Sequence, residues 1–279
     1  MFTINCKGKI LSLDHPLLMG IINATPDSFY HGHLEGGIDT MITVAEKMIT
    51  DGADILDIGG QSTRPGSQRI SANEELQRVL PVVEAIHLKF PETIISIDTY
   101  YPAVAIAAVD AGASLINDIS SGNMDDNMIA TVADLRVPYI CMHMQGTPAD
   151  MQREPKYTNV VSEILDFFIR KTEQCKNAGI TDIIIDPGFG FGKTIEHNFQ
   201  LLKNLSVFAI TGKPVLAGLS RKSTIYKTLG ITADEALNGT TVLNTIALMN
   251  GASILRVHDV QAAKEAVLLF NAYKNAPQS

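Results

Sequence analysis

Eight short apolar runs recur along this chain, and each ends in polar or ionisable side chains. The runs begin at residues 17, 53, 93, 113, 138, 182, 214 and 252. They are rich in Val, Ile and Leu with little alternation, which is typical of strands buried on both faces. The polar groups at their ends are Asn23, Asp57, Asp98, Asn117 with Asp118, His143, Asp186, Arg221 with Lys222, and Arg256 with His258.

Helical patterns separate these runs, for example over residues 38–50, 71–89, 101–111, 159–177 and 234–250. Several of these patterns stop at a glycine just before the next run, where a positive-φ residue ends a helix at least cost. The glycines are Gly52, Gly112, Gly179 and Gly251. Strict strand–helix alternation predicts an α/β protein with a parallel sheet.

Eight such units favour a closed (β/α)₈ TIM barrel over an open sheet. Two short β-type segments around Lys7-Gly8 predict an N-terminal hairpin over residues 1–14. Neither a composition shift nor a polar linker marks a second domain, so we expect one domain over residues 1–279. The carboxyl ends of barrel strands share one face, and we therefore expect the polar strand ends to form one site.

Charge and hydropathy restrict the function. A net charge of −8 argues against broad nucleic-acid binding, which needs a basic face. Arg221, Lys222 and Arg256 are expected to make a local positive site that suits a small anionic molecule. The apolar stretches are shorter than the ~18 residues of a membrane span, and charges lie where a signal peptide would be apolar. We expect a cytoplasmic protein without a membrane partner.

A glycine-rich run over residues 188–194 resembles a phosphate-binding loop only superficially. The spacing from its first glycine to Gly-Lys-Thr is one residue short, and the run follows a sixth strand. It also lacks the dinucleotide fingerprint that opens a first βαβ unit. We interpret its glycines as allowing the loop backbone to approach a flat ligand closely, with the Phe191 side chain forming an apolar side of the pocket.

Taken together, the motifs resemble those of the dihydropteroate synthases, a family of pterin-binding TIM barrels. The similar segments follow one another in family order at successive strand ends. They are residues 23–29, 59–66, 97–99, 117–119, 142–148, 186–193, 220–223 and 256–259. The resemblance implies a folate-pathway transferase that joins dihydropterin pyrophosphate to p-aminobenzoate and releases pyrophosphate, with Mg²⁺ as cofactor and a homodimeric state. Inhibition by sulfonamides, which mimic p-aminobenzoate, would follow.

The resemblance also implies residue roles. The pterin would contact Asp98, Asn117, Asp186, Lys222 and Arg256, with the Asp186 carboxylate accepting from the ring edge. Thr63, Phe191 and Ser223 would frame the p-aminobenzoate pocket. Asn23 would bind Mg²⁺. Arg64, Arg256 and His258 would meet the pyrophosphate, and the catalytic set would be Asn23, Arg64, Lys222, Arg256 and His258.

The chemistry suited to these residues is dissociative. An electron-rich pterin can share the positive charge on its methylene carbon, so departure of the pyrophosphate precedes attack by the amine. The protein then supplies positioning and electrostatic stabilisation instead of a covalent nucleophile. This expectation agrees with a sequence that lacks a Ser-His-Asp or Cys-His signature.

Two positions depart from the family pattern. His31 stands in the first loop where a carboxylate is usual, and Gln61 stands in the second loop where Glu is common. We still expect a working enzyme. Two alternatives remain open at this point: a methyltetrahydrofolate-binding methyltransferase, which would not need the Ser-Thr-Arg-Pro loop, and a non-catalytic pterin-binding barrel, which would tolerate loss of Asn23, Arg64 and His258.

Overall fold

The architecture is a barrel of parallel strands, seen in a computed structural model that describes residues 2–25, 37–62 and 66–277. The strands of its main sheet lie in the order β8-β7-β6-β5-β4-β3-β10-β9, and every pairing is parallel. Val215, next to β9, bridges to Ile185 on β8, so the sheet nearly closes on itself. The predicted TIM-barrel fold is confirmed. The strands are β3 (Leu17–Asn23), β4 (Ile55–Gly59), β5 (Ile94–Asp98), β6 (Leu115–Asp118), β7 (Tyr139–Met142), β8 (Ile183–Asp186), β9 (Leu216–Ala217) and β10 (Ile254–Val257).

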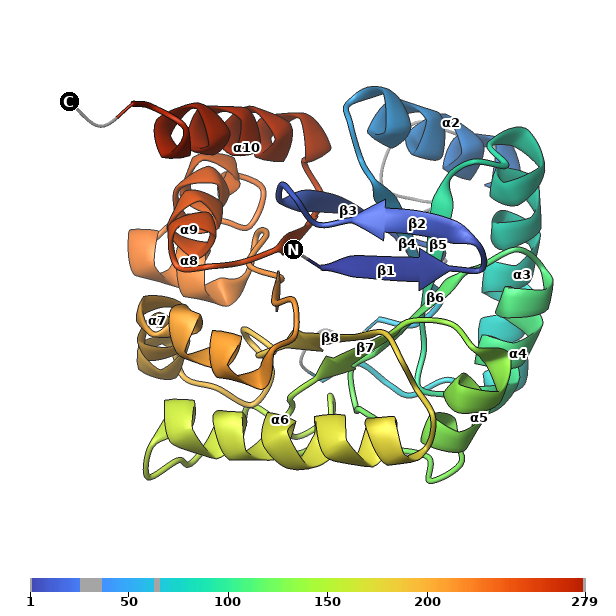
Figure 1. The fold of residues 1–279 in the computed structure, drawn as a ribbon, viewed down its shortest axis with the longest axis horizontal. Helices are drawn as coiled ribbons and strands as arrows, with labels where there is room; N and C mark the ends of the chain where they lie inside the picture. Colours follow the sequence, from blue (N-terminus) through green and yellow to red (C-terminus); the bar gives the residue numbers. More distant parts are fainter. Residues whose placement is uncertain (1, 26–36, 63–65, 278–279) are drawn as a thin grey trace.

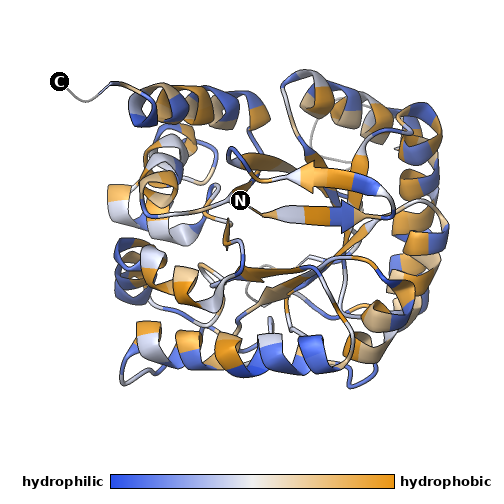
Figure 2. Ribbon diagram, in the orientation of Figure 1, coloured by the Kyte–Doolittle hydropathy of each residue, from blue (hydrophilic) through white to orange (hydrophobic). Residues whose placement is uncertain are grey.

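Helices form an outer ring around these strands (Figure 1). Their inward residues join the strands in one large apolar cluster between the two layers. Figure 2 shows mainly hydrophobic colours on the strands and mixed colours on the helices, which face water on one side. The helices are α2 (Gly37–Thr50), α3 (Ala72–Lys89), α4 (Pro102–Asp110), α5 (Met128–Leu135), α6 (Val160–Asn177), α7 (Ile195–Lys203), the 3₁₀ helix η1 (Leu205–Thr211), α8 (Ser223–Leu229), α9 (Leu237–Met249) and α10 (Val260–Lys274).

Local sequence signals account for many helix ends. Ser71 begins α3 with a capping box in which its side chain and that of Glu74 each accept from the other residue's backbone N–H. Asn159 caps α6 by accepting from two backbone N–H groups. The four predicted glycine stops all have positive φ, between 95° and 123°.

The N-terminal hairpin covers one end of the barrel. β1 (Thr3–Cys6) pairs antiparallel with β2 (Lys9–Ser12) through the positive-φ turn Lys7-Gly8, as predicted. Its buried side chains Ile4, Cys6 and Leu11 join an apolar cluster with residues at the beginnings of the barrel strands. Figure 1 shows the hairpin lying across this end of the barrel. The opposite end, where the strands finish, is left for the site.

Two elements differ from the prediction. The seventh barrel strand, β9, is only two residues long, Leu216–Ala217. The predicted helix 234–250 begins at Leu237, since Thr232 and Glu235 form a side-chain-capped turn before it. Among the described residues, no helix has the length and apolar character needed to cross a membrane.

Candidate active site

Arg256 lies between two carboxylates at the carboxyl end of the barrel. Its Nε donates to Asp57 Oδ2 and its Nη2 donates to Asp98 Oδ2, each at 2.7 Å. The Arg256 side chain is 19% exposed, whereas that of Asp57 is fully buried. Ion pairs withdrawn from water are costly to break, because each partner would be left charged and poorly solvated. The guanidinium is therefore held firmly in the mouth of the barrel.

Asp57 also orients Asn117. The Nδ2 of Asn117 donates to the same Asp57 Oδ2 at 3.0 Å, and Asn117 is buried. Burial raises the pKa of Asp98 to about 7, against the opposing effect of Arg256. The three strands β4, β5 and β6 thus contribute a connected polar rim whose members are fixed by one another.

The two carboxylate oxygens of Asp186 have different surroundings. Oδ1 accepts from the backbone N–H of Gly188 at 2.7 Å, which forms the turn after β8. Burial raises the pKa of this carboxyl, and Lys222 opposes the shift. Asp186 is 5% exposed. Its second oxygen, Oδ2, lies on the side of Gly218.

Gly218 marks the place where Asp186, Lys222 and Arg256 meet. A Cβ added at Gly218 would lie 3.6 Å from Lys222 Nζ and 4.0 Å from both Arg256 Cβ and Asp186 Oδ2. Residues from β8, β10 and the segment after β9 therefore lie around the same glycine. This convergence of strand ends is the arrangement on which the sequence interpretation depends.

Lys222 lies between Gly218 and the glycine-rich loop. Its Nζ donates to Phe189 O at 2.6 Å and lies 4.7 Å from the centre of the Phe191 ring. Burial lowers the pKa of Lys222 to about 8, although Asp186 attracts the charged form. The lysine begins helix α8 as its N-cap residue, and Ser223 is the first helical residue.

The glycine-rich loop approaches protein backbone very closely. A Cβ on Gly188 would lie 2.0 Å from His143 O, and one on Gly192 would lie 2.4 Å from Gln145 O. Both glycines also have positive φ. Lys193, which is buried, donates to His143 O at 3.2 Å and to Phe191 O at 2.9 Å. The glycines thus serve close packing onto the loop after β7, which places Phe191 beside Lys222.

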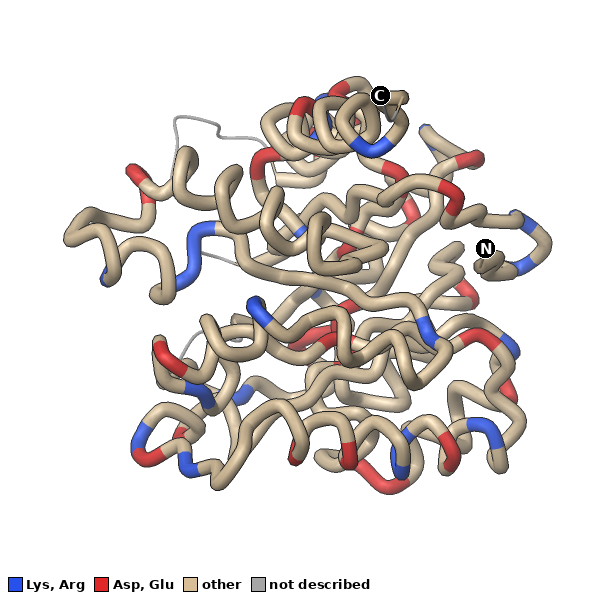
Figure 3. Tube along the Cα trace, turned by 60° about the vertical axis from the view of Figure 1, so that its left-hand side comes forward, with Lys and Arg blue, Asp and Glu red and all other residues tan. Residues whose placement is uncertain are grey.

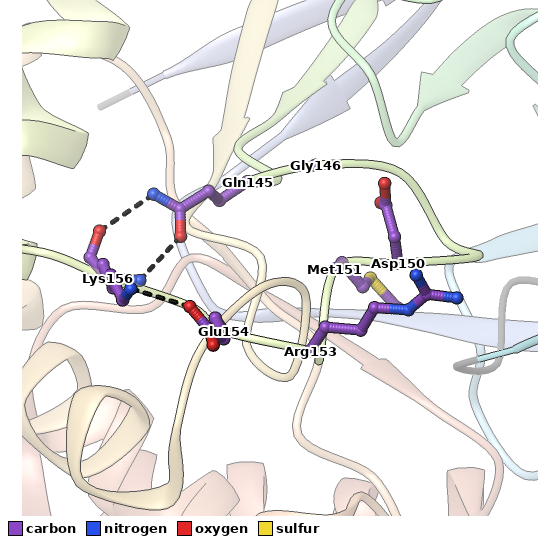
Figure 4. Close-up of a pocket in the computed structure, with 7 residues that line it drawn as sticks. All are labelled: Gln145, Gly146, Asp150, Met151, Arg153, Glu154 and Lys156. Carbon is purple, nitrogen blue, oxygen red and sulfur yellow. Dashed lines mark hydrogen bonds and ion pairs between the residues drawn. The ribbon is translucent and has the colours of Figure 1, made fainter.

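The loop after β7 carries a cavity of about 330 Å³ of its own (Figure 4). Gln145 closes the loop by donating to Lys156 O and accepting from Lys156 N–H. The loop contacts its neighbours through Tyr157 Oη, which donates to Gly192 O at 2.9 Å, and through Pro148 O, which accepts from Gly66 N–H. Its main structural effect is to support the glycine-rich loop. The lining residues are Gln145, Gly146, Asp150, Met151, Arg153, Glu154 and Lys156.

Two of the three cations expected to form a positive site, Arg221 and Arg256, are paired with carboxylates of the protein itself. Arg221 donates twice to Asp259, from Nε at 2.8 Å and from Nη2 at 2.9 Å, and its Nη1 donates to two backbone carbonyls. Arg256 is similarly engaged by Asp57 and Asp98. Figure 3 shows acidic and basic residues interspersed over the helices in that view. The sequence prediction of a positive site considered the cations at the strand ends but not the carboxylates that pair with them.

His258 lies one residue beyond β10 and contacts Ser220. Ser220 Oγ lies 2.9 Å from His258 Nδ1 and accepts from the His258 backbone N–H at 3.2 Å. Neighbouring groups exclude water from part of the ring, and Arg256 adds positive charge, so the pKa of His258 is lowered to about 4. His258 and Arg256 therefore have different partners, although they are two residues apart.

Known proteins resemble this chain over nearly its whole length. A family model described as pterin binding enzyme matches residues 19–258. The dihydropteroate synthase of Haemophilus influenzae is 45% identical over 97% of this chain and 98% of that protein. The chain belongs to the pterin-binding enzymes, among the dihydropteroate synthases.

Two solved dihydropteroate synthases share the fold closely. The Xanthomonas albilineans enzyme with 4-aminobenzoic acid has a TM-score of 0.92 at 41% identity, covering 99% of each chain. The Yersinia pestis dihydropteroate synthase in a sulfonamide drug complex has a TM-score of 0.94 at 41% identity, covering 99% of this chain and 100% of that chain. The resemblance inferred from the motifs is confirmed.

The predicted site residues other than His258 divide into three groups. Asp98, Asn117, Asp186, Lys222 and Arg256 come together at the mouth of the barrel. Asn23 is exposed at the end of β3. The Phe191 ring lies beside Lys222 Nζ, and Ser223 follows Lys222 in sequence as the first residue of α8. Thr63 and Arg64, together with His31, lie outside the described residues.

The sequence interpretation assigned no individual role to three residues that organise this site. Asp57 joins Arg256 to Asn117, Lys193 fastens the glycine-rich loop, and Ser220 contacts His258. Asp57 had a visible signal, because it is a carboxylate inside an otherwise apolar strand. Ser220 and Lys193 had little signal beyond their places in the motifs.

Proposed function

We propose that this protein condenses 6-hydroxymethyl-7,8-dihydropterin pyrophosphate with p-aminobenzoate, giving 7,8-dihydropteroate and pyrophosphate. The observation that carries this function is the convergence of Asp186, Lys222 and Arg256 around Gly218 in a chain that belongs to the dihydropteroate synthases. The methyltransferase and the non-catalytic barrel are not favoured, since the near-full-length relatives are named dihydropteroate synthases.

The pterin ring is proposed to bind edge-on in the barrel mouth. Asp186 keeps one oxygen for the amino group and ring N–H of the pterin, because Gly188 occupies the other. Lys222 donates to the ring carbonyl. Asp98 and Asn117 complete the polar rim, and Arg256 packs along it in an orientation fixed by Asp57.

The p-aminobenzoate is proposed to lie between Phe191 and the start of α8. Phe191 is 9% exposed and stacks near Lys222, so it supplies an apolar surface for the benzoate ring. The carboxylate is proposed to lie near Ser223, and Thr63 is proposed to help frame the same pocket. The sulfonamide complex of the Yersinia pestis relative supports the expectation that sulfonamides compete for this position here.

The reaction is proposed to be dissociative. As the pyrophosphate leaves, positive charge develops on the pterin methylene, and the amine of p-aminobenzoate attacks it. Arg64, Arg256 and His258 stabilise the departing anion, and the barrel holds the two substrates in line. Loss of one proton from the attacking amine completes the exchange.

Mg²⁺ is proposed as the cofactor, held by Asn23. The described residues contain no cluster of three or more His, Cys, Asp or Glu side chains that could hold a metal ion. A single neutral oxygen ligand at an exposed strand end fits an ion that takes its remaining ligands from phosphate and water. When bound, the ion would neutralise charge on the pyrophosphate.

A homodimer in the cytoplasm completes the proposal. Helix α9 buries one face on the barrel, yet it exposes Val242 (50%) and Met249 (53%), and α10 exposes Leu268 (58%) and Leu269 (73%). Apolar side chains gathered on neighbouring helices favour association with a second copy. Analytical ultracentrifugation of the protein and of Val242→Glu would test this, with a monomer expected for the variant.

Turnover of the two substrates tests the function. Purified protein is incubated with dihydropterin pyrophosphate, p-aminobenzoate and Mg²⁺, and both dihydropteroate and pyrophosphate are measured. We expect the two products in equal amounts, and a large loss in Asp186→Asn. Pyrophosphate release without formation of dihydropteroate when both substrates are present, or formation of neither product, would refute the proposal.

A further inference from the structure

Ser220 and His258 follow adjacent strands and contact each other through two hydrogen bonds. Ser220 comes after β9 and His258 after β10, and these strands pair in parallel. The His258 backbone N–H donates to Ser220 Oγ at 3.2 Å, and the same Oγ lies 2.9 Å from Nδ1 of the imidazole. Ser220 is 4% exposed, so water contributes little to this arrangement.

The number of protons and lone pairs decides the direction of the second bond. A serine hydroxyl has one proton to donate and two lone pairs that accept. The His258 backbone N–H occupies one lone pair. If Nδ1–H donated as well, the buried hydroxyl proton would need another acceptor, and within the described residues Ser220 Oγ contacts only these two groups of His258. Every group is satisfied when the hydroxyl donates to Nδ1.

The imidazole is neutral at ordinary pH, so this direction fixes its tautomer. Partial removal of the ring from water, together with the charge on Arg256, lowers the pKa of His258 to about 4. A neutral imidazole carries its single proton on one nitrogen only. If Nδ1 accepts from Ser220, the proton resides on Nε2. His258 is an exposed residue, so a ligand can approach it from solvent.

We propose that Ser220 is a positioning residue that holds His258 as the Nε2–H tautomer and thereby aims an N–H donor at the departing pyrophosphate. The proposal rests on the function proposed above, in which His258 meets that anion. In the other tautomer, a nitrogen lone pair would face the anionic oxygens and oppose binding. Ser220 therefore acts through His258 and touches neither substrate.

Nuclear magnetic resonance of the ring nitrogens tests the tautomer directly. Protein with ¹⁵N-labelled histidine gives distinct patterns for the two neutral tautomers, and His258→Gln identifies the signals of His258. We expect the Nε2–H pattern in the unaltered protein and a shift toward mixed tautomers in Ser220→Ala. A Nδ1–H pattern in the unaltered protein would overturn the proposal, whether or not any variant folds.

Steady-state kinetics test the consequence. We expect Ser220→Ala to lower kcat/KM for the pterin pyrophosphate on the order of tenfold, the effect of one misdirected charge-assisted hydrogen bond, with little change in KM for p-aminobenzoate. Ser220→Thr keeps a hydroxyl and should retain most activity. Ser114→Ala, at another serine that is 6% exposed, serves as the control for packing.

A double-mutant cycle separates this role from a merely structural one. If Ser220 acts through His258, then Ser220→Ala combined with His258→Gln should be no slower than His258→Gln alone. Multiplied losses would contradict the proposal. Failure of the proposed function is distinguishable, because the unaltered protein would then make no dihydropteroate while the resonance pattern still reports the tautomer.

Discussion

Asp57 and Arg256 are 199 residues apart in sequence and share a hydrogen bond of 2.7 Å at the mouth of the barrel. The bond joins β4 to β10, with β3 between them in the sheet. Asp57 Oδ2 also accepts a hydrogen bond from Asn117 Nδ2. Asp57 Oδ1 is buried and has no hydrogen-bond partner among the described residues. One buried carboxylate thus fixes a cation and an amide of the proposed pterin site.

Asp57→Asn should therefore impair both stability and substrate binding. The substitution leaves the partly buried guanidinium with Asp98 as its remaining partner, so the loss should be smaller than the about 3–5 kcal/mol of an uncompensated buried charge. Urea unfolding measures the loss. Asp51→Asn is the matched control, since the exposed Lys47–Asp51 pair spans one helical turn and is worth roughly 0.3–0.5 kcal/mol. Equal effects of the two variants would refute a special role for Asp57.

The pH dependence of catalysis should reflect Lys222. Burial lowers the pKa of this lysine from 10.5 to about 8, so its charge is present below pH 8 and is lost as the pH rises through that value. We expect kcat/KM for the pterin pyrophosphate to fall above about pH 8. In Lys222→Arg the guanidinium stays charged, and the fall should move upward.

The same lysine has an opposite effect on folding. Because the folded pKa lies below the unfolded value, the unfolded chain binds more protons between about pH 8 and 10.5, and the contribution of Lys222 to stability rises with pH across that window. For the kinetic prediction, a decline in kcat/KM at the same pH in the unaltered protein and in Lys222→Arg would assign the titration to a group other than Lys222.

Two glycines with nearly equal φ separate backbone strain from close packing. Gly192 (φ 62°) would place a Cβ 2.4 Å from Gln145 O, whereas Gly212 (φ 63°) has open space around it. Gly212→Ala should cost about 1 kcal/mol, from the left-handed conformation alone. Gly192→Ala should cost considerably more and raise KM for p-aminobenzoate by displacing Phe191. Thermal unfolding and kinetics of both variants check this, and similar losses of stability would contradict the packing account.

The departure at His31 should have little effect on the chemical step. His31 holds a position where the family commonly has a carboxylate, and it is not assigned a direct contact with the pterin. We predict that His31→Asp gives no large gain in kcat in steady-state assays at saturating Mg²⁺. A large rate gain would show that the natural loop is impaired.

The fold was predictable because its signals are local and repeated. Each apolar run, helix pattern and glycine stop can be seen within about twenty residues, and strand–helix alternation leaves few topologies. The extent of β9 and the start of α9 were less accessible, since hydrophobic periodicity encodes neither the length over which a strand pairs nor the Thr232–Glu235 turn.

The sequence predicted which strand-end residues gather at the site, but not which of them form hydrogen bonds with one another. Barrel geometry requires Asp98, Asn117, Asp186 and Arg256 to gather at one face, and they do. Which carboxylate meets which guanidinium depends on register and side-chain orientation across several strands. This is why Arg221 was grouped with the site cations, although Asp259 holds its guanidinium.

The central claim is that one space binds a flat pterin at one side and a charged leaving group at the other. Calorimetric binding of dihydropterin pyrophosphate and of 6-hydroxymethylpterin, which lacks the pyrophosphate, tests it in Asp186→Asn and His258→Gln with Mg²⁺ held constant. The account predicts that Asp186→Asn weakens both ligands and that His258→Gln weakens only the pyrophosphate. Unchanged hydroxymethylpterin binding in Asp186→Asn, or the same pattern in both variants, would contradict it.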